Sequence, residues 1–157
     1  MHEFTYYQVR DVMTHDPFTI KPDTPVGDIE VIFEKHDFNG LPVINEKRNL
    51  LGMVTKLDLL KAFDFNEKTK IPPYNTIITY RCEKIMSTSV KAIRPEAPLT
   101  RVLHHMIETG FKSFPVVEDG ILVGIVARED ILRAIGLASG GIIPDRFHEK
   151  DNAEVMI

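Results

Sequence analysis

A hydroxyl, a cation and a carboxylate lie close together in the segment Gly52-Met53-Val54-Thr55-Lys56-Leu57-Asp58. The apolar residues before Thr55 predict a strand and the pattern after it predicts a helix, so the polar side chains fall at a strand-to-helix corner. The first N–H groups of a helix lack partners and carry partial positive charge, which suits a phosphate. Thr55 could add a hydroxyl donor, Lys56 a positive charge, and Asp58 an acceptor for both hydroxyls of a ribose. This corner therefore favours a ribose-phosphate ligand.

A second interpretation of the corner needs no ligand. Thr55 and Asp58 have the spacing of a capping box, in which each side chain accepts a hydrogen bond from the other residue's backbone N–H. Lys56 could equally be a solvated surface charge. Both interpretations stay open on the residues alone.

The corner has a counterpart, because the chain contains two copies of one sequence pattern. The matched residues are Met13 with Met86, Pro22 with Pro95, Pro25 with Pro98, Pro42 with Pro115, Gly52 with Gly124, and Asp58 with Asp130. The first four pairs are 73 residues apart and the last two are 72 apart, and the slip falls in a polar turn. This period is too long for a solenoid unit, so the pattern predicts two related half-modules.

The second copy of the corner is chemically weaker. Ala127 stands where the first copy has Thr55, so the hydroxyl is missing, while Arg128 and Asp130 keep the cation and the carboxylate. The capping box is expected to be broken there. A carboxylate that persists without its capping partner favours another use for Asp130, although acidic residues near helix N-termini are stabilising in any case.

Composition excludes several classes of function. The chain has 157 residues, a net charge of −4 and 43% hydrophobic residues, which fits one compact domain or two joined halves. Nothing indicates nucleic-acid or membrane binding, since basic clusters and long apolar runs are missing. Cys82 is the one cysteine, which excludes an internal disulfide and suits the cytoplasm. No nucleophile-base set or metal-ligand spacing is present, so we expect no catalysis and no metal.

Hydrophobic periodicity predicts the same order of elements in both copies. In copy one these are an extended stretch at 18–20, a helix from Pro25 with Thr24 as its N-cap, strands at 41–44 and 50–54, and a helix at 55–63. In copy two they are an extended stretch at 90–93, a helix from Pro98 to a C-cap at Gly110, strands at 114–117 and 121–126, and a helix at 128–135. The apolar helix faces are expected to be Val26, Ile29, Ile32 and Phe33, and Leu99, Val102, Leu103, Met106 and Ile107. The predicted divisions are repeat 1 at 1–63, a linker at 64–81, repeat 2 at 82–138 and a tail at 139–157.

Three motifs, each present twice, resemble the cystathionine β-synthase (CBS) domain. They are Val12-Met13-Thr14, Leu41-Pro42-Val43-Ile44 and Gly52 to Asp58, with Ile85-Met86-Ser87, Phe114-Pro115-Val116-Val117 and Gly124 to Asp130 in copy two. The resemblance covers about residues 9–135. It implies an α+β fold of two pseudo-symmetric β-α-β-β-α repeats packed sheet to sheet as one Bateman module. It also implies a regulatory module that binds adenosine-type ligands in clefts between the repeats and often forms homodimers.

By the same resemblance, each cleft combines residues of both repeats. The first cleft would hold Thr14, Thr19, Ile20, Phe38, Asn39 and Gly40 with Arg128 and Asp130. The second would hold Ser87, Ala92, Ile93, Phe111, Lys112, Ser113 and Pro115 with Thr55, Lys56 and Asp58. The second cleft is the preferred one, because it joins the intact Thr55/Asp58 pair to two lysines. For the phenylalanines, simple core packing is at least as good an interpretation.

The predicted ligand is an adenine nucleotide (AMP, ADP or ATP), with S-adenosylmethionine, NAD or a cyclic dinucleotide as further candidates. The predicted assembly is a cytoplasmic homodimer with a separate protein partner as a further candidate. The alternative function is a ligand-free dimerisation scaffold for a separate enzyme, transporter or transcription regulator.

Overall fold

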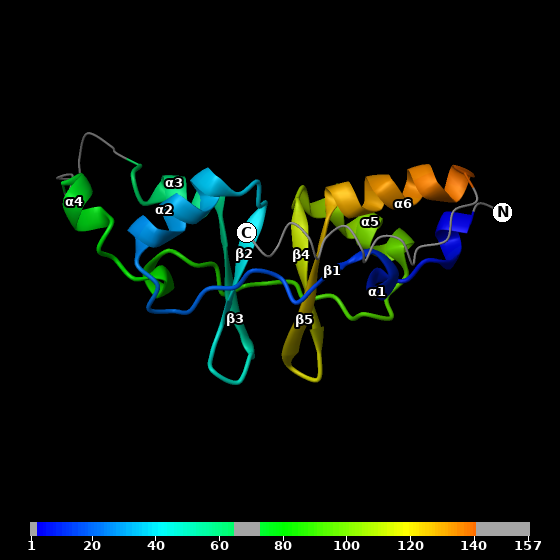
Figure 1. Ribbon diagram of the computed structural model, residues 1–157, viewed down its shortest axis with the longest axis horizontal. Coiled ribbons are helices and arrows are strands. Elements are labelled where there is room, and N and C mark those ends of the chain that lie inside the picture. The colour runs from blue at the N-terminus through cyan, green and yellow to red at the C-terminus, as the bar shows by residue number, and fades with distance from the viewer. Residues whose placement is uncertain (1–2, 65–72, 141–157) are drawn as a thin grey trace. The chain divides into compact units, whose positions relative to one another are not determined.

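The computed structural model describes residues 3–64 and 73–140, and the fold is the α+β fold expected from the sequence (Figure 1). The helices are η1 (Glu3–Tyr6), α1 (Val9–Val12), α2 (Val26–Lys35), α3 (Lys56–Lys61), α4 (Tyr74–Ile77), η2 (Cys82–Lys84), α5 (Leu99–Thr109) and α6 (Arg128–Gly140). The strands are β1 (Thr14–His15), β2 (Gly40–Ile44), β3 (Leu50–Thr55), β4 (Ser113–Glu118) and β5 (Ile121–Ala127). The two strands and the closing helix predicted for each copy are all present. Among the described residues, no helix is both long and apolar enough to cross a bilayer.

The chain divides into two compact units, and each is made of more than one sequence copy. Unit 1 comprises the described residues of Met1–Phe18 and Lys91–Ile157, and unit 2 is Thr19–Val90. The start of copy one, up to Phe18, therefore belongs with the rest of copy two, and the start of copy two, up to Val90, belongs with the rest of copy one. The limits predicted at 1–63, 64–81 and 82–138 follow the repeated pattern and stay a prediction.

Unit 1 is an antiparallel sheet with helices on one side of its hairpin (Figure 1). In the described part of the unit the strand order is β1-β5-β4, with Thr14 opposite Ile125 and Pro115 opposite the same residue on the other side. Ile93 adds a parallel bridge to Val116. Alternate residues of β5 and one face of α5 fill the core, because strands alternate faces and helices repeat every 3.6 residues.

Unit 2 has the same plan around the β2-β3 hairpin. Gly40 lies opposite Thr55, Ile20 forms a parallel bridge to Val43, and the backbone of Ser87 pairs with Met53. Its core includes Cys82, whose N–H donates to the carbonyl of Thr24 at 2.7 Å. Burial, with the nearby charge of Glu83, raises the pKa of the Cys82 thiol to about 12. The thiol is therefore protonated and unreactive at neutral pH.

In each unit, a strand glycine allows another segment of the chain to pack closely against the hairpin. A Cβ on Gly124 would lie 2.6 Å from the Met13 sulfur and 2.8 Å from the Thr14 carbonyl oxygen. A Cβ on Gly52 would lie 2.7 Å from the Ser87 carbonyl oxygen. Both distances are shorter than real Cβ contacts, so a side chain at either glycine would push the paired segment away.

Several predicted details were wrong. Thr24 does not cap α2: Pro25 is the N-cap, and the Thr24 hydroxyl accepts from the Lys21 N–H at 3.0 Å, which closes the preceding turn instead. Ile107 is 73% exposed, because the buried face of α5 is set by Leu99, Val102 and Met106, and Ile107 lies about 100° from Met106 on the helix.

The segments outside the hairpins also differ from the sequence pattern. The extended stretches at 18–20 and 90–93 form only isolated bridges at Ile20 and Ile93. The closing helix of copy two continues to Gly140, five residues beyond its predicted end. The predicted linker contains α4, while its residues 65–72 and the tail from 141 lie outside the described residues. The C-cap predicted at Gly110 is confirmed, with φ of 70° in the left-handed region.

Gly124→Ala should destabilise the protein by about 1–3 kcal/mol, because the new methyl meets a backbone carbonyl that cannot move without breaking the β1-β5 pairing. Urea unfolding monitored by circular dichroism measures the change. Gly136→Ala is the matched control: apart from its neighbours in the α6 backbone, no described atom lies within 4 Å of the added methyl, and it should stabilise α6 by about 0.5–1 kcal/mol. Equal effects at both glycines would contradict the close-approach explanation.

Candidate functional site

The strand-to-helix corner of unit 2 forms a complete capping box. β3 runs directly into α3, and the Asp58 N–H donates to Thr55 Oγ1 at 3.2 Å. In return, Asp58 Oδ2 accepts from the Thr55 N–H at 2.8 Å and from the Thr55 hydroxyl at 3.0 Å. The capping interpretation is therefore correct for this structure. The capping box uses only one carboxylate oxygen of Asp58, Oδ2, and Oδ1 has no hydrogen bond to any described residue.

The cation of this corner is loosely held. Lys56 Nζ lies 3.5 Å from Asp37 Oδ1, and the side chain of Asp37 is fully exposed. An exposed pair of this kind is worth about 0–1 kcal/mol, so Lys56 can exchange Asp37 for another anion at little cost. The pairing of Gly40 with Thr55 also places the start of β2 beside the corner.

The corner of unit 1 uses its carboxylate differently. The Ala127 N–H donates to Asp130 Oδ2 at 2.7 Å, so half of the capping box survives without the hydroxyl. Asp130 Oδ1 accepts from the Arg133 guanidinium, and the Asp130 residue is only 3% exposed. The reciprocal box is broken as expected, because Ala127 has no side-chain oxygen, and the remaining bond needs only the backbone N–H of Ala127.

Arg128, the cation of the unit 1 corner, is tied to the end of α5. Its guanidinium donates to the carbonyl of Gly110 at 2.6 Å and to the carbonyl of Phe111 at 3.3 Å. Its backbone N–H donates to the carbonyl of Lys112 at 3.0 Å. These bonds satisfy carbonyl groups that a helix C-terminus leaves unpaired. Arg128 is therefore held by two hydrogen bonds to carbonyl oxygens, whereas Lys56 has one exposed ion pair with Asp37 among the described residues.

The other predicted site residues lie in both units, and the two composite clefts stay predictions. Unit 2 contains Thr19, Ile20, Phe38, Asn39, Gly40 and Ser87 together with the Thr55 corner. Unit 1 contains Thr14, Ala92, Ile93, Phe111, Lys112, Ser113 and Pro115 together with the Asp130 corner. Phe38 packs against the core of unit 2 and stacks on His36 at 4.9 Å between ring centroids, which supports core packing. Phe111 is half exposed and lies 5.9 Å from the ring of Phe114.

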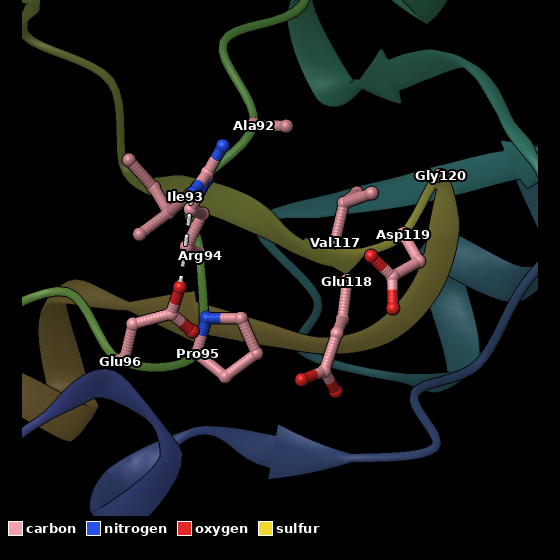
Figure 2. A pocket seen from close by; sticks show the side chains of 9 residues that line it. All are labelled: Ala92, Ile93, Arg94, Pro95, Glu96, Val117, Glu118, Asp119 and Gly120. Carbon is pink, nitrogen blue, oxygen red and sulfur yellow. Dashed lines mark ion pairs between the residues drawn. The ribbon is translucent and has the colours of Figure 1, made fainter.

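A cavity of about 420 Å³ lies beside the β4-β5 turn of unit 1 (Figure 2). Its walls are Ala92 to Glu96 and Val117 to Gly120, and Arg94 lies 4.0 Å from Glu96 at one edge. Two of the predicted site residues, Ala92 and Ile93, line this cavity. Glu96, Glu118 and Asp119 outnumber the single arginine, which disfavours a phosphate here.

Two side chains that form ion pairs with charged groups of the corners were not predicted from the sequence. Arg133 lies three residues after Asp130 on α6, and Asp37 faces Lys56 from the end of α2. Opposite charges three residues apart on a helix do signal a pair, so Arg133 could have been found. Asp37 had no such signal, because it lies in the loop after α2, 19 positions before Lys56.

A duplicated hairpin-and-helix unit with a capped strand-to-helix corner defines a class of paired α+β modules. The chain belongs to the CBS domain family, whose model matches residues 9–64 and 82–137. It is 31% identical over 133 residues to the A-adding tRNA nucleotidyltransferase of Aquifex aeolicus, a match that covers 85% of this chain and 15% of the relative. It is 31% identical over 129 residues to the L-aspartate semialdehyde sulfurtransferase of Methanocaldococcus jannaschii, covering 82% of this chain and 23% of that protein. The chain thus spans a small part of these two relatives.

Solved structures give the same family. CBSX2 in complex with AMP has a TM-score of 0.71 and 34% identity, with 85% of this chain and 98% of that chain covered. The CBS domain pair of protein MJ0100, in complex with 5′-methylthioadenosine and S-adenosyl-L-methionine, has a TM-score of 0.68 and 29% identity, with coverages of 83% and 96%.

Thr55→Ala should lower the free energy of unfolding by about 1 kcal/mol, because it removes the hydroxyl that accepts the Asp58 N–H. Thr55→Ser is the matched control and should be nearly neutral, since it keeps that oxygen. Ala127→Thr should change stability in the opposite direction by completing the second box. Chemical denaturation of the three variants measures these values, and an unchanged Thr55→Ala protein would contradict the capping role.

Proposed function

We propose that this chain is a regulatory module that binds an adenosine-containing ligand at the Thr55–Asp58 corner and catalyses no reaction itself. The observation that carries the proposal is Asp58 Oδ1, which no described residue hydrogen-bonds, beside a weakly paired cation, Lys56. A carboxylate oxygen that keeps its lone pairs can accept ribose hydroxyls, and an ammonium can neutralise a phosphate or carboxylate of the same ligand.

The relatives support the adenosine part of this proposal. AMP, 5′-methylthioadenosine and S-adenosylmethionine share an adenosine group, and they are bound by two CBS pairs that resemble this chain along most of its length. We propose AMP, ADP or ATP as the first candidates and S-adenosylmethionine as the next. The tail of the ligand differs among them, while the ribose that Asp58 would hold is common to all.

Regulation follows if the ligand binds one conformation of the module better than another. A ligand shifts a conformational equilibrium only by its difference in affinity for the two states. The enzymatic relatives match this chain over 15% and 23% of their lengths, which fits a control element attached to a separate catalytic part. We propose that this module likewise controls the activity of a protein partner.

Saturating ligand, at about 100 times its Kd, should stabilise the chain by about 2.7 kcal/mol, which is a rise in Tm of about 5–10 °C at this length. Differential scanning fluorimetry with AMP, ADP, ATP, S-adenosylmethionine, 5′-methylthioadenosine and NAD measures the shift. Asp58→Asn should weaken it strongly, because the neutral amide keeps a capping oxygen but loses the charge that holds the hydroxyls.

Asp23→Asn is the control for the loss of a carboxylate, since Asp23 is exposed in a turn of the same unit. It should keep the full shift in Tm. A wild-type protein whose Tm changes with none of these ligands would contradict the proposed function, and so would an Asp58→Asn variant that responds like the wild type.

A second function, as a homodimeric scaffold, is favoured by apolar side chains on the helix surfaces. Leu57 and Leu60 on α3 are 60% and 64% exposed, and Leu132 on α6 is 68% exposed. Exposed leucines at helical spacing are typical of a face that packs on another protein. We propose that a second copy of the chain covers these faces, with or without the ligand.

Leu60→Glu and Leu132→Glu should each convert a dimer to a monomer at micromolar concentration, because a buried, unpaired carboxylate opposes association. Light scattering coupled to size exclusion measures the molar mass, and Lys47→Glu in the exposed β2-β3 turn is the control that should stay dimeric. A monomeric wild type would contradict the dimer. Dimers that survive both leucine substitutions would show that another surface is used.

A further inference from the structure

The two corners of the chain differ in how many carboxylate oxygens they offer. Asp58 is half-buried and uses Oδ2 for the capping box, which leaves Oδ1 without a described partner. Asp130 is 3% exposed, and it uses Oδ2 for the Ala127 N–H and Oδ1 for Arg133. A neutral hydroxyl can therefore reach the carboxylate of the first corner more readily than that of the second.

The difference depends on one pair of equivalent residues. Arg133 follows Asp130 by three positions, and Lys61 follows Asp58 by three positions. Lys61 is exposed and has no described contact with Asp58, whereas the Arg133 guanidinium is paired with Asp130. The longer, planar guanidinium fork suits a carboxylate three residues away better than a flexible, strongly hydrated ammonium does.

We infer that Arg133 keeps the Asp130 corner closed to the ligand, so that the chain binds one adenosine ligand, at Asp58. This inference rests on the proposed function. A ribose hydroxyl at Asp130 would have to replace a charge-assisted hydrogen bond, which is about twice as strong as a neutral one. At Asp58 the hydroxyl meets an oxygen that no described residue occupies.

The cations of the two corners support the same assignment. Arg128 is held by the carbonyls of Gly110 and Phe111, so a ligand anion would compete with two hydrogen bonds. Within the described residues, Lys56 pairs only with the exposed Asp37, at 3.5 Å. In unit 1 both the carboxylate and the cation that a ribose-phosphate needs already have side-chain or carbonyl partners. In unit 2 the carboxylate oxygen Oδ1 has no described partner and the cation has one weak, exposed partner.

Isothermal titration of the full chain with AMP, and separately with S-adenosylmethionine, measures the number of sites. The wild type should bind one ligand per chain. Arg133→Ala should add a second binding event, because it removes the guanidinium from Asp130 Oδ1 without changing the Asp58 corner. Arg133→Lys should also add a second binding event, of lower affinity, and it replaces the alanine variant if that variant does not fold.

Lys61→Arg is the reciprocal variant, which places the same guanidinium beside Asp58. It should weaken ligand binding by about tenfold or more, since the ligand must then break an ion pair with a charged donor. A purely structural role for Arg133 would change the melting temperature without changing the number of sites. The melting temperatures of all variants are therefore recorded beside the titrations.

Two ligands per wild-type chain would overturn the inference and leave the proposed function intact. A single site in both Arg133 variants, with no loss of affinity in Lys61→Arg, would also overturn the inference alone. No binding of either probe to any variant would overturn both.

Discussion

Both units depend on the close approach of a short flanking segment to a strand glycine. At Gly124 the approach brings Met13 and Thr14 against β5, and at Gly52 it brings Ser87 against β3. The paired backbones leave no space for a Cβ, so the glycine and the pairing require each other. Because each approaching segment lies at the start of the other copy, each compact unit joins residues that the repeated pattern separates. The chain must therefore fold with long-range contacts in both halves.

The hairpins position the two strand-to-helix corners, where the proposed ligand-binding side chains lie. β3 and β5 each deliver a carboxylate to the first turn of the following helix, where it accepts the N–H of the residue that ends the strand. This bond is common to Asp58 and Asp130, so the scaffold explains why both carboxylates are present. What differs is the remaining oxygen, which Arg133 takes in one corner. Capping and the proposed ligand binding are thus compatible at Asp58, because capping uses Oδ2 and the ligand would use Oδ1.

Local signals predicted much of this structure, and long-range contacts account for the rest. Proline-containing apolar runs marked β2 and β4, and Gly110 marked the end of α5. The spacing of Thr55 and Asp58 predicted the capping box together with its ligand alternative. The composition of the two units could not be predicted, since a two-residue strand such as β1 has no periodicity. Ile107 was misplaced because an apolar residue beside a helix face looks like part of it. Arg133 was missed although its spacing of three residues from Asp130 on a predicted helix signals an ion pair.

A crystal structure of the chain grown with AMP, and a second grown with S-adenosylmethionine, tests the central claim most directly. The account predicts a ribose whose hydroxyls lie within hydrogen-bonding distance of Asp58 Oδ1, with Lys56 turned from Asp37 toward the ligand and Asp130 still paired with Arg133. A ribose bound at Asp130 with Arg133 displaced would contradict it. So would a ligand that binds away from both carboxylates, or crystals in which neither compound is bound.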